Sequence, residues 1–169
     1  TDALELIKAQ GFGVAAFKTD DPTEIMGVNN KLQLSEAAEI MRGRILKAHM
    51  LAGVTVIDPK NTYIDKSVRI GRDVTIYPGC ILEGSTVIDE DCIIGPNTRI
   101  KNSVLDRGVQ VQNSIVLDSK IGEETSVGPY AYLRPGNLIG KHAKIGDFVE
   151  MKNSSFGDNS KVSHLTYVG

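Results

Sequence analysis

The stretch from Ile70 to Ile100, IGRDVTIYPGCILEGSTVIDEDCIIGPNTRI, decides the fold because an aliphatic residue returns in it at every sixth position. The same period reaches back to Ile64 and returns, after an interruption, from 121 to 151. Two residues before each aliphatic position the residue is small or Val, with the single exception of Asn137. A six-residue repeat with one strongly apolar position predicts a short strand and a corner, with the aliphatic side chain pointing inward.

Three such repeats close one triangular coil of 18 residues, so residues 64 to 169 predict about six coils stacked at ~4.8 Å, the strand spacing of a sheet. The pattern resembles that of the left-handed parallel β-helix, and the handedness is implied by this resemblance rather than by the spacing. The register slips between Ile100 and Ile121 and resumes one residue early at Phe156. The expected fold class is therefore mainly β.

The residues before the repeats predict a short α/β tail and one long linker helix. Helical spacing of apolar residues indicates a short helix over 2–10, a brief strand over 14–17 and a helical turn that begins near Pro22. From Asn30 to Leu51 apolar residues recur at three and four, and Gly53 follows as a C-terminal cap. This pattern predicts a single long helix.

Composition narrows the function classes. The 169 residues contain 19 basic and 21 acidic side chains, for a net charge of -2, which argues against nucleic-acid binding through bulk charge. No apolar run approaches the ~18 residues that a membrane helix needs, and the N-terminus carries no secretory signal. We therefore expect a soluble, cytoplasmic protein with neither nucleic-acid nor membrane partners.

The cysteines and two of the three histidines have structural interpretations. Cys80 and Cys92 are 12 residues apart and so fall on different edges of the triangle, as corner fillers rather than a zinc or redox pair. His49 ends the long helix, and His142 falls on a corner. The histidine spacing does not build a three-histidine metal cage, which disfavours a carbonic-anhydrase-like solenoid.

The 18-residue coil also predicts which surface residues meet. Arg134 and Lys152 both follow an inward aliphatic residue and are 18 apart, so we expect them on one face of neighbouring coils. Two stacked cations repel each other, and an anion such as a phosphate would relieve that repulsion. His164 and Tyr167 follow closely and are expected to border the same groove, where a histidine can act as a general base. The alternative is that all of them are ordinary surface residues.

Several longer motifs point to one family: GVNNKLQLSEA at 27–37, LAGVTVIDP at 51–59, YLRPG at 132–136, GDFVEMKNS at 146–154 and SHLTYVG at 163–169. In these motifs the chain closely resembles the bacterial bifunctional N-acetylglucosamine-1-phosphate uridyltransferase / glucosamine-1-phosphate N-acetyltransferase family. The resemblance covers essentially the whole chain. It implies that 1–31 is the C-terminal tail of the uridyltransferase domain, 32–52 the linker helix, and 53–169 the first part of the acetyltransferase β-helix.

The resemblance also implies roles for particular residues. Arg134 and Lys152 match the residues that hold the sugar phosphate, Tyr167 matches a further substrate contact, and His164 matches the catalytic general base. Asn29 matches the residue that binds Mg²⁺ and the nucleotide-sugar, although a helix cap would also explain an Asn at that place.

The implied reactions are acetyl transfer from acetyl-CoA to glucosamine-1-phosphate and then uridylyl transfer from UTP, which make UDP-N-acetylglucosamine for cell-wall and lipopolysaccharide synthesis. The implied assembly is a homotrimer. Because the sequence stops within a repeat at Gly169, we expect a fragment in which neither active site is complete. Two alternatives stay open, another hexapeptide acyltransferase with a different acceptor and a non-catalytic trimerisation scaffold.

Overall fold

The computed structural model describes residues 2–169, which divide into two compact units, one ending at Ile40 and the other comprising Met41–Gly169. The boundary lies within the long helix α2 (Lys31–Leu51). Each unit is described by itself.

The first unit contains helices and extended chain. Helix α1 (Asp2–Ala9) and the 3₁₀ helix η1 (Pro22–Ile25) lie where the sequence predicted them. The side chain of Asp21 accepts a hydrogen bond from the Thr23 N–H at 2.9 Å, and Pro22 occupies the first turn, so both features begin η1. The strand predicted over 14–17 is wrong, because this segment pairs with no other strand of the described chain and stays irregular.

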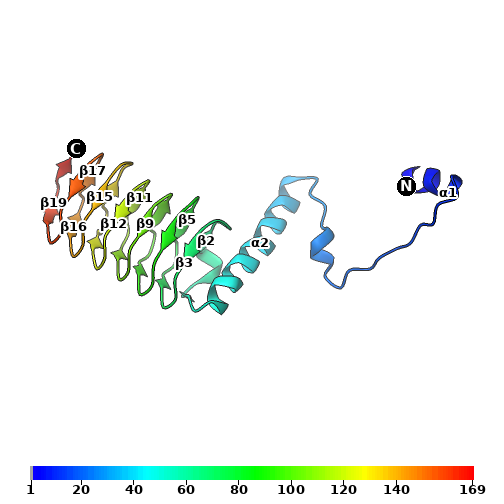
Figure 1. The fold of residues 1–169 in the computed structure, drawn as a ribbon, viewed down its shortest axis with the longest axis horizontal. Coiled ribbons are helices and arrows are strands. Elements are labelled where there is room, and N and C mark those ends of the chain that lie inside the picture. Colours follow the sequence, from blue (N-terminus) through cyan, green and yellow to red (C-terminus); the bar gives the residue numbers. More distant parts are fainter. Residues whose placement is uncertain (1) are drawn as a thin grey trace. The chain divides into compact units, whose positions relative to one another are not determined.

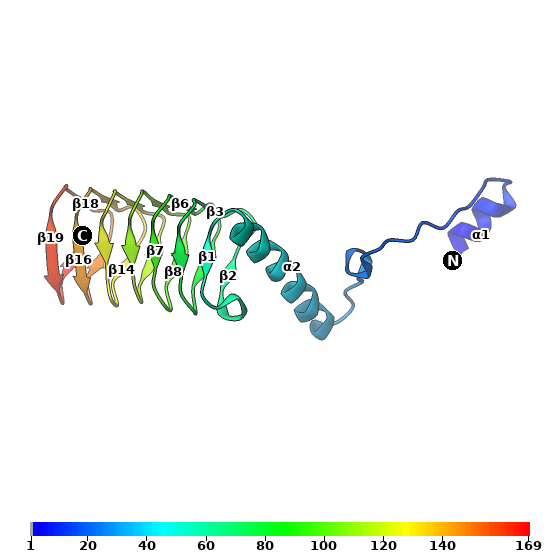
Figure 2. The same cartoon turned by 90° about the horizontal axis from the view of Figure 1, so that it is seen from below.

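The unit Met41–Gly169 is a stack of triangular coils whose strands form three parallel sheets (Figures 1 and 2). The first sheet contains β1 (Thr55–Val56), β4 (Thr75–Ile76), β7 (Ile93–Ile94), β10 (Gln110–Val111), β13 (Ser126–Val127), β16 (Lys144–Asp147) and β19 (Lys161–His164). The second sheet contains β2 (Tyr63–Ile64), β5 (Ile81–Glu83), β8 (Arg99–Lys101), β11 (Ile115–Leu117), β14 (Tyr132–Leu133), β17 (Glu150–Met151) and β20 (Tyr167–Val168). The third sheet contains β3 (Arg69–Ile70), β6 (Val87–Ile88), β9 (Val104–Leu105), β12 (Lys120–Ile121), β15 (Leu138–Ile139) and β18 (Ser155–Phe156).

Each strand pairs with the strand three further along the chain, so one circuit adds one strand to every sheet. This arrangement confirms the predicted fold class, a left-handed parallel β-helix built from hexapeptide repeats. Seven strands in each of the two longer sheets give about seven coils, one more than predicted. The extra coil begins at β1 and contains the 3₁₀ helix η2 (Pro59–Asn61), which hides the six-residue period before Ile64.

The core is a column of the aliphatic side chains that the period singled out. From Ile64 to Met151 every such side chain is at most 6% exposed, apart from the half-buried Ile70. The interrupted region keeps the pattern, because Leu105, Val111 and Val116 are buried as well. Each inward branched side chain stabilises the fold by roughly 1.5–3 kcal/mol through burial.

The C-terminal part of α2 packs on the N-terminal end of this core. Leu46 is buried in the core, and Ile45 packs against it. The guanidinium of Arg42 lies 5.0 Å from the centre of the Tyr63 ring, a cation–π contact with β2 of the first coil. The helix therefore covers apolar surface that the first coil would otherwise expose.

Candidate functional site

The second sheet brings Arg134 and Lys152 onto neighbouring coils. Leu133 and Met151 are register partners in β14 and β17, and Arg134 and Lys152 each follow one of them. The Arg134 N–H donates to the Met151 carbonyl at 2.8 Å, and the Lys152 N–H donates to the Val168 carbonyl at 2.9 Å. The stacking that the 18-residue spacing predicted is therefore the observed arrangement.

The guanidinium of Arg134 is held by a carboxylate of the next coil. Arg134 Nη1 donates to Glu150 Oε1 at 2.9 Å, and both side chains are about two-fifths exposed. This hydrogen bond is the main cause that raises the pKa of the Arg134 guanidinium above its ordinary value. Because Glu150 is the register partner of Tyr132 and Tyr167, the guanidinium reaches back over the row of the second sheet that these two tyrosines occupy.

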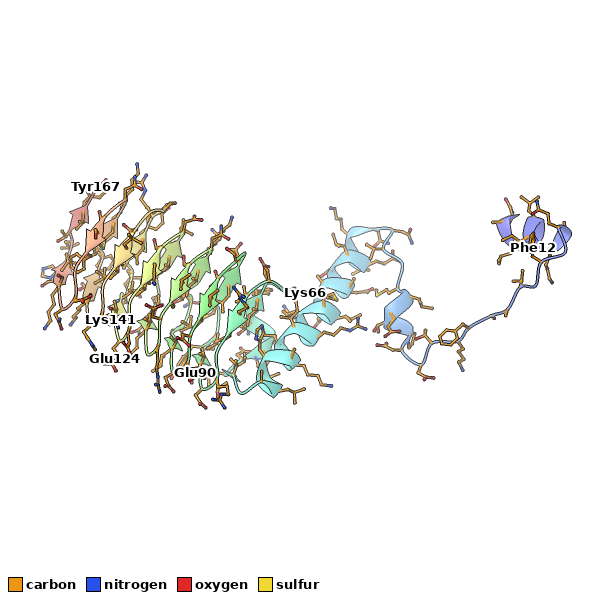
Figure 3. All side chains as sticks on the ribbon, in the orientation of Figure 1. Phe12, Lys66, Glu90, Glu124, Lys141 and Tyr167 are labelled. Carbon is orange, nitrogen blue, oxygen red and sulfur yellow. The ribbon has the colours of Figure 1, made fainter. Side chains whose placement is uncertain are left out.

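Tyr167 completes this row on the last coil (Figure 3). Its side chain is exposed, and its hydroxyl lies beside the Cα of Gly169. Gly169 follows Val168 as Lys152 follows Met151, so the ring lies along the sheet toward the side that carries the two cations. Arg134, Lys152 and Tyr167 therefore share one face of the second sheet.

His164 lies on the first sheet, next to the corner that leads into the second sheet. It ends β19, is the register partner of Asp147, and is exposed at the corner that leads into β20. Four residues lie between it and Gly169, a path of about 16 Å in extended backbone. His164 and the two cations are therefore not in direct contact. The strand positions of Glu150 and Tyr167 on the second sheet lie between them.

Like charges are not the rule in the stacked positions of this solenoid. At the corner between the third and first sheets, Arg72 pairs with Glu90 at 3.5 Å, and Glu123 pairs with Lys141 at 3.1 Å, both between successive coils. Figure 3 shows Glu90 and Lys141 along this edge. Lys152, by contrast, has no ion pair within the described part of the chain and stacks next to another cation. Lys144 and Lys161, in register on the first sheet, are another stacked pair of like charges, so the stacking at Lys152 leaves a charge that an anion can pair with but is not unique to it.

Asn29 belongs to the first unit. Its backbone N–H donates to Gln33 Oε1 at 2.7 Å, while the side chain of the next residue, Asn30, accepts from the Gln33 N–H at 2.9 Å and so caps α2. The alternative role of Asn29 as the helix cap is therefore wrong.

Mg²⁺ takes about six oxygen ligands in a near-octahedral shell. Asn29 offers one amide oxygen, and residues 2–169 contain no group of three or more histidine, cysteine or carboxylate side chains placed to hold a metal. The residues present do not by themselves fit this ion.

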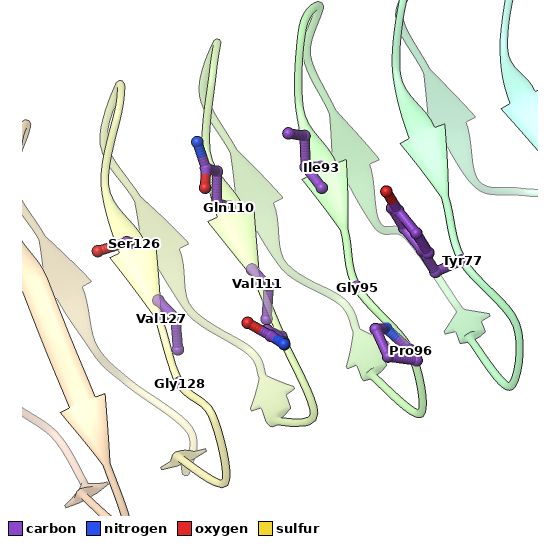
Figure 4. Close-up of a pocket in the computed structure, with 10 residues that line it drawn as sticks. Tyr77, Ile93, Gly95, Pro96, Gln110, Val111, Ser126, Val127 and Gly128 are labelled. Atoms are coloured by element: carbon purple, nitrogen blue, oxygen red, sulfur yellow. The ribbon is translucent and has the colours of Figure 1, made fainter.

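One hollow of the described surface does not coincide with the candidate residues. It has a volume of about 320 Å³ and lies on the first sheet between Tyr77 and Gly128 (Figure 4). Its walls include Ile93, Gly95 and Pro96. No charged side chain lines this hollow. The second sheet, which carries two cations, is therefore the better candidate for binding an anionic substrate.

The cysteines have the structural role that the sequence predicted. Cys80 and Cys92 are fully buried, and each Sγ lies 3.2 Å from a backbone carbonyl of the following coil. Burial raises the pKa of both thiols, that of Cys92 to about 11. The thiolate, which is the reactive form, is therefore scarce at neutral pH.

We expect neither thiol to react with 5,5′-dithiobis(2-nitrobenzoate) at about pH 8 in the folded protein, because both are buried and protonated. Unfolding in guanidinium should release both. The measurement is the absorbance of the thionitrobenzoate released before and after unfolding. Rapid reaction of one thiol in the folded protein would contradict a corner-filling role.

Sequence reasoning overlooked Glu150. The signal was present, because Arg134 and Glu150 are 16 residues apart, as are the ion-paired Glu83 and Arg99. Register partners on neighbouring coils are 18 residues apart in this part of the chain, so residues 16 apart lie on neighbouring coils with a shift of two residues along the strand. An arginine side chain is long enough to span that shift. A search for opposite charges at this spacing would have found the pair.

Comparison with known proteins agrees with this fold. The family described as "Bacterial transferase hexapeptide (six repeats)" matches residues 67–102. Among solved structures, the acetyltransferase domain of PglB from Neisseria gonorrhoeae in complex with acetyl coenzyme A has a TM-score of 0.61 and 16% identity, covering 75% of this chain and 63% of that one. A mutant of perosamine N-acetyltransferase from Caulobacter crescentus, in complex with CoA and GDP-perosamine, has a TM-score of 0.61 and 17% identity over 78% of this chain and 62% of that one. The class is thus that of hexapeptide-repeat β-helix proteins.

Curated relatives narrow the class further. The chain is 52% identical over all 169 residues to "Bifunctional protein GlmU" of Alkaliphilus metalliredigens and 56% identical to the protein of that name from Clostridium kluyveri. It spans 37% of the length of each. The chain is therefore homologous to part of bifunctional protein GlmU, and the family resemblance carried by its motifs is confirmed. None of the helices described in residues 2–169 has the length and apolarity needed to cross a membrane.

Proposed function

We propose that this chain is the acceptor-binding part of an enzyme that transfers an acetyl group from acetyl-CoA to the amine of glucosamine-1-phosphate. The observation that carries the proposal is the stacked pair Arg134 and Lys152 on the face of the second sheet, in a chain homologous to bifunctional protein GlmU. The solved acetyltransferases with CoA bound share its fold, which supports the same class of reaction.

In this proposal the phosphate of the acceptor binds between Arg134 and Lys152. Arg134 supplies a planar pair of N–H donors and Lys152 a point charge, a combination suited to a phosphate group. Because Glu150 already holds one side of the Arg134 guanidinium, the rotamer of Arg134 is partly fixed before the substrate arrives. Tyr167 borders the sugar, in the row between the phosphate and His164.

His164 acts as the general base toward the acceptor amine. The amine nitrogen attacks the acetyl carbonyl carbon, the new C–N bond forms, and the C–S bond to coenzyme A breaks. The proton that the nitrogen gives up passes to His164 and from there to the departing thiolate, so that charge and protons balance. The exposed corner position of His164 leaves its ring open to substrate.

The second proposed reaction is uridylyl transfer from UTP to N-acetylglucosamine-1-phosphate in a preceding domain. Residues 1–31 are its C-terminal tail, 32–52 the linker helix and 53–169 the start of the acetyltransferase β-helix. Asn29 contributes one ligand to a Mg²⁺ and nucleotide-sugar site whose other ligands lie outside this chain. We further propose a homotrimer that shares its acetyltransferase sites between subunits.

The experiment that tests the proposal is an acetyl-transfer assay with acetyl-CoA and glucosamine-1-phosphate, run on the full-length protein and on this chain alone. We propose that the full-length protein is active and the chain alone is not, because the coils that bind acetyl-CoA lie elsewhere. Activity toward a different amino sugar only would favour another hexapeptide acyltransferase. Trimerisation of the full-length protein with no transfer at all would favour the scaffold.

A further inference from the structure

A column of polar side chains runs inside the solenoid, beneath the corner where the second sheet leads into the third. On successive coils its members are Thr86, Ser103, Ser119, Asn137 and Ser154. They are joined from coil to coil: the Ser119 N–H donates to Ser103 Oγ at 3.2 Å, and Asn137 Nδ2 donates to Ser119 Oγ at 3.3 Å. Arg134 and Lys152 lie directly before this corner, so the column forms the inner wall behind the proposed phosphate site.

Asn137 is the member of this column that the repeat does not explain. Four of the five members carry a hydroxyl, whereas Asn137 places a primary amide in a site that is 1% exposed. A buried amide is costly unless its donors and acceptor are paired. Here they are, because the amide nitrogen donates to the Arg134 carbonyl and to the Met151 carbonyl, the latter at 3.3 Å, and Oδ1 accepts from the Ser154 N–H at 3.2 Å.

These partners surround the backbone that carries the two cations. Met151 and Ser154 lie on either side of Lys152, and the third partner is the carbonyl of Arg134 itself. A hydroxyl at this place is too short to reach all three, whereas the longer amide ties the coil of Arg134 to the coil of Lys152.

The Asn137 amide also spans the turn at this corner. Between Arg134 and Asn137 it turns through Pro135 and Gly136, and Gly136 has a φ of +90°, in the left-handed region that glycine enters most easily. The Gly136 N–H donates to the Asp118 carbonyl of the preceding coil at 3.0 Å. The hydrogen bond from the Asn137 side chain to the Arg134 carbonyl spans the turn from within, and Ser119 Oγ donates to the same carbonyl at 3.2 Å.

We propose that Asn137 is a positioning residue that sets the spacing of Arg134 and Lys152 for the phosphate of the acceptor. It touches no substrate and acts through the backbone of these two residues. The inference rests on the proposed function, since it concerns the same phosphate site. It adds a specificity-determining residue in the core, behind the face that binds the substrate.

The test is steady-state acetyl-transfer kinetics of the full-length protein with Asn137→Ala and Asn137→Ser. Asn137→Ala should raise the KM for glucosamine-1-phosphate about tenfold and leave kcat within about twofold, because His164 lies on another strand, in the first sheet. Asn137→Ser restores a hydroxyl like those of the neighbouring coils but cannot make all three contacts of the amide, so it should recover only part of the loss and keep a KM at least threefold above the wild type.

Ser103→Ala is the matched control, because it removes a member of the same column two coils away from Arg134. It should lower the melting temperature and leave KM unchanged. An Asn137→Ala protein with the wild-type KM, or one that does not fold, would overturn the positioning role, since the amide would then support the coil as a whole. Wild-type protein without acetyl transfer would instead refute the proposed function, so the two failures are distinguishable.

Discussion

Replacing His164 with alanine in the full-length protein should lower the kcat of acetyl transfer by about 10² to 10⁴, the usual contribution of a general base. The KM for glucosamine-1-phosphate should change little, because the proposed phosphate contacts come from Arg134 and Lys152 on the face of the second sheet. The measurement is the rate of coenzyme A release at saturating acetyl-CoA.

Stability separates a chemical role for His164 from a structural one. His164 is the last residue of β19 and its side chain is exposed. Loss of the imidazole should therefore leave the melting temperature close to that of the wild type. His142→Ala is the matched control, since His142 is also an exposed histidine of the solenoid, and its Nδ1 lies 3.3 Å from Glu124 Oε2. If both variants keep their rate, or if His164→Ala loses its rate because it melts, His164 is not the base.

The solenoid could be predicted from the sequence because one side-chain position decides each repeat. Only an aliphatic residue fits the inside of a triangular coil, so the period of Ile76, Leu82 and Ile88 specifies both the strands and their inward face. The spacing of 18 follows from three sides per coil and correctly placed Arg134 beside Lys152. Geometry that repeats along the chain can be read from the chain alone.

What could not be predicted depends on partners or on local insertions. The segment 14–17 has apolar residues of strand type, but a strand exists only where another backbone pairs with it, and the described chain offers none. The first coil was overlooked because η2 interrupts the period. Asn137 was recognised only as an exception, since the sequence does not show which carbonyls a buried amide reaches.

Arg134→Ala and Lys152→Ala in the full-length protein should each raise the KM for glucosamine-1-phosphate by about 10- to 150-fold, which corresponds to the loss of a charge-assisted contact worth roughly 1.5–3 kcal/mol. Both should leave kcat within a few-fold, because neither group takes part in proton transfer. Uridylyl transfer should be unchanged in both variants. The measurement is the dependence of the acetyl-transfer rate on acceptor concentration.

The effect of Arg134→Ala should be the larger of the two, because it also leaves Glu150 without its cation next to the phosphate. The negative charges of the Glu150 carboxylate and the phosphate repel each other once Arg134 is gone. Lys152→Ala leaves no carboxylate without its cation. Lys144→Ala is the matched control: Lys144 and Lys161 are a second pair of stacked cations, in register on β16 and β19 of the first sheet. If this control raises KM as strongly as Lys152→Ala, overall positive charge attracts the acceptor and the second sheet holds no defined phosphate site.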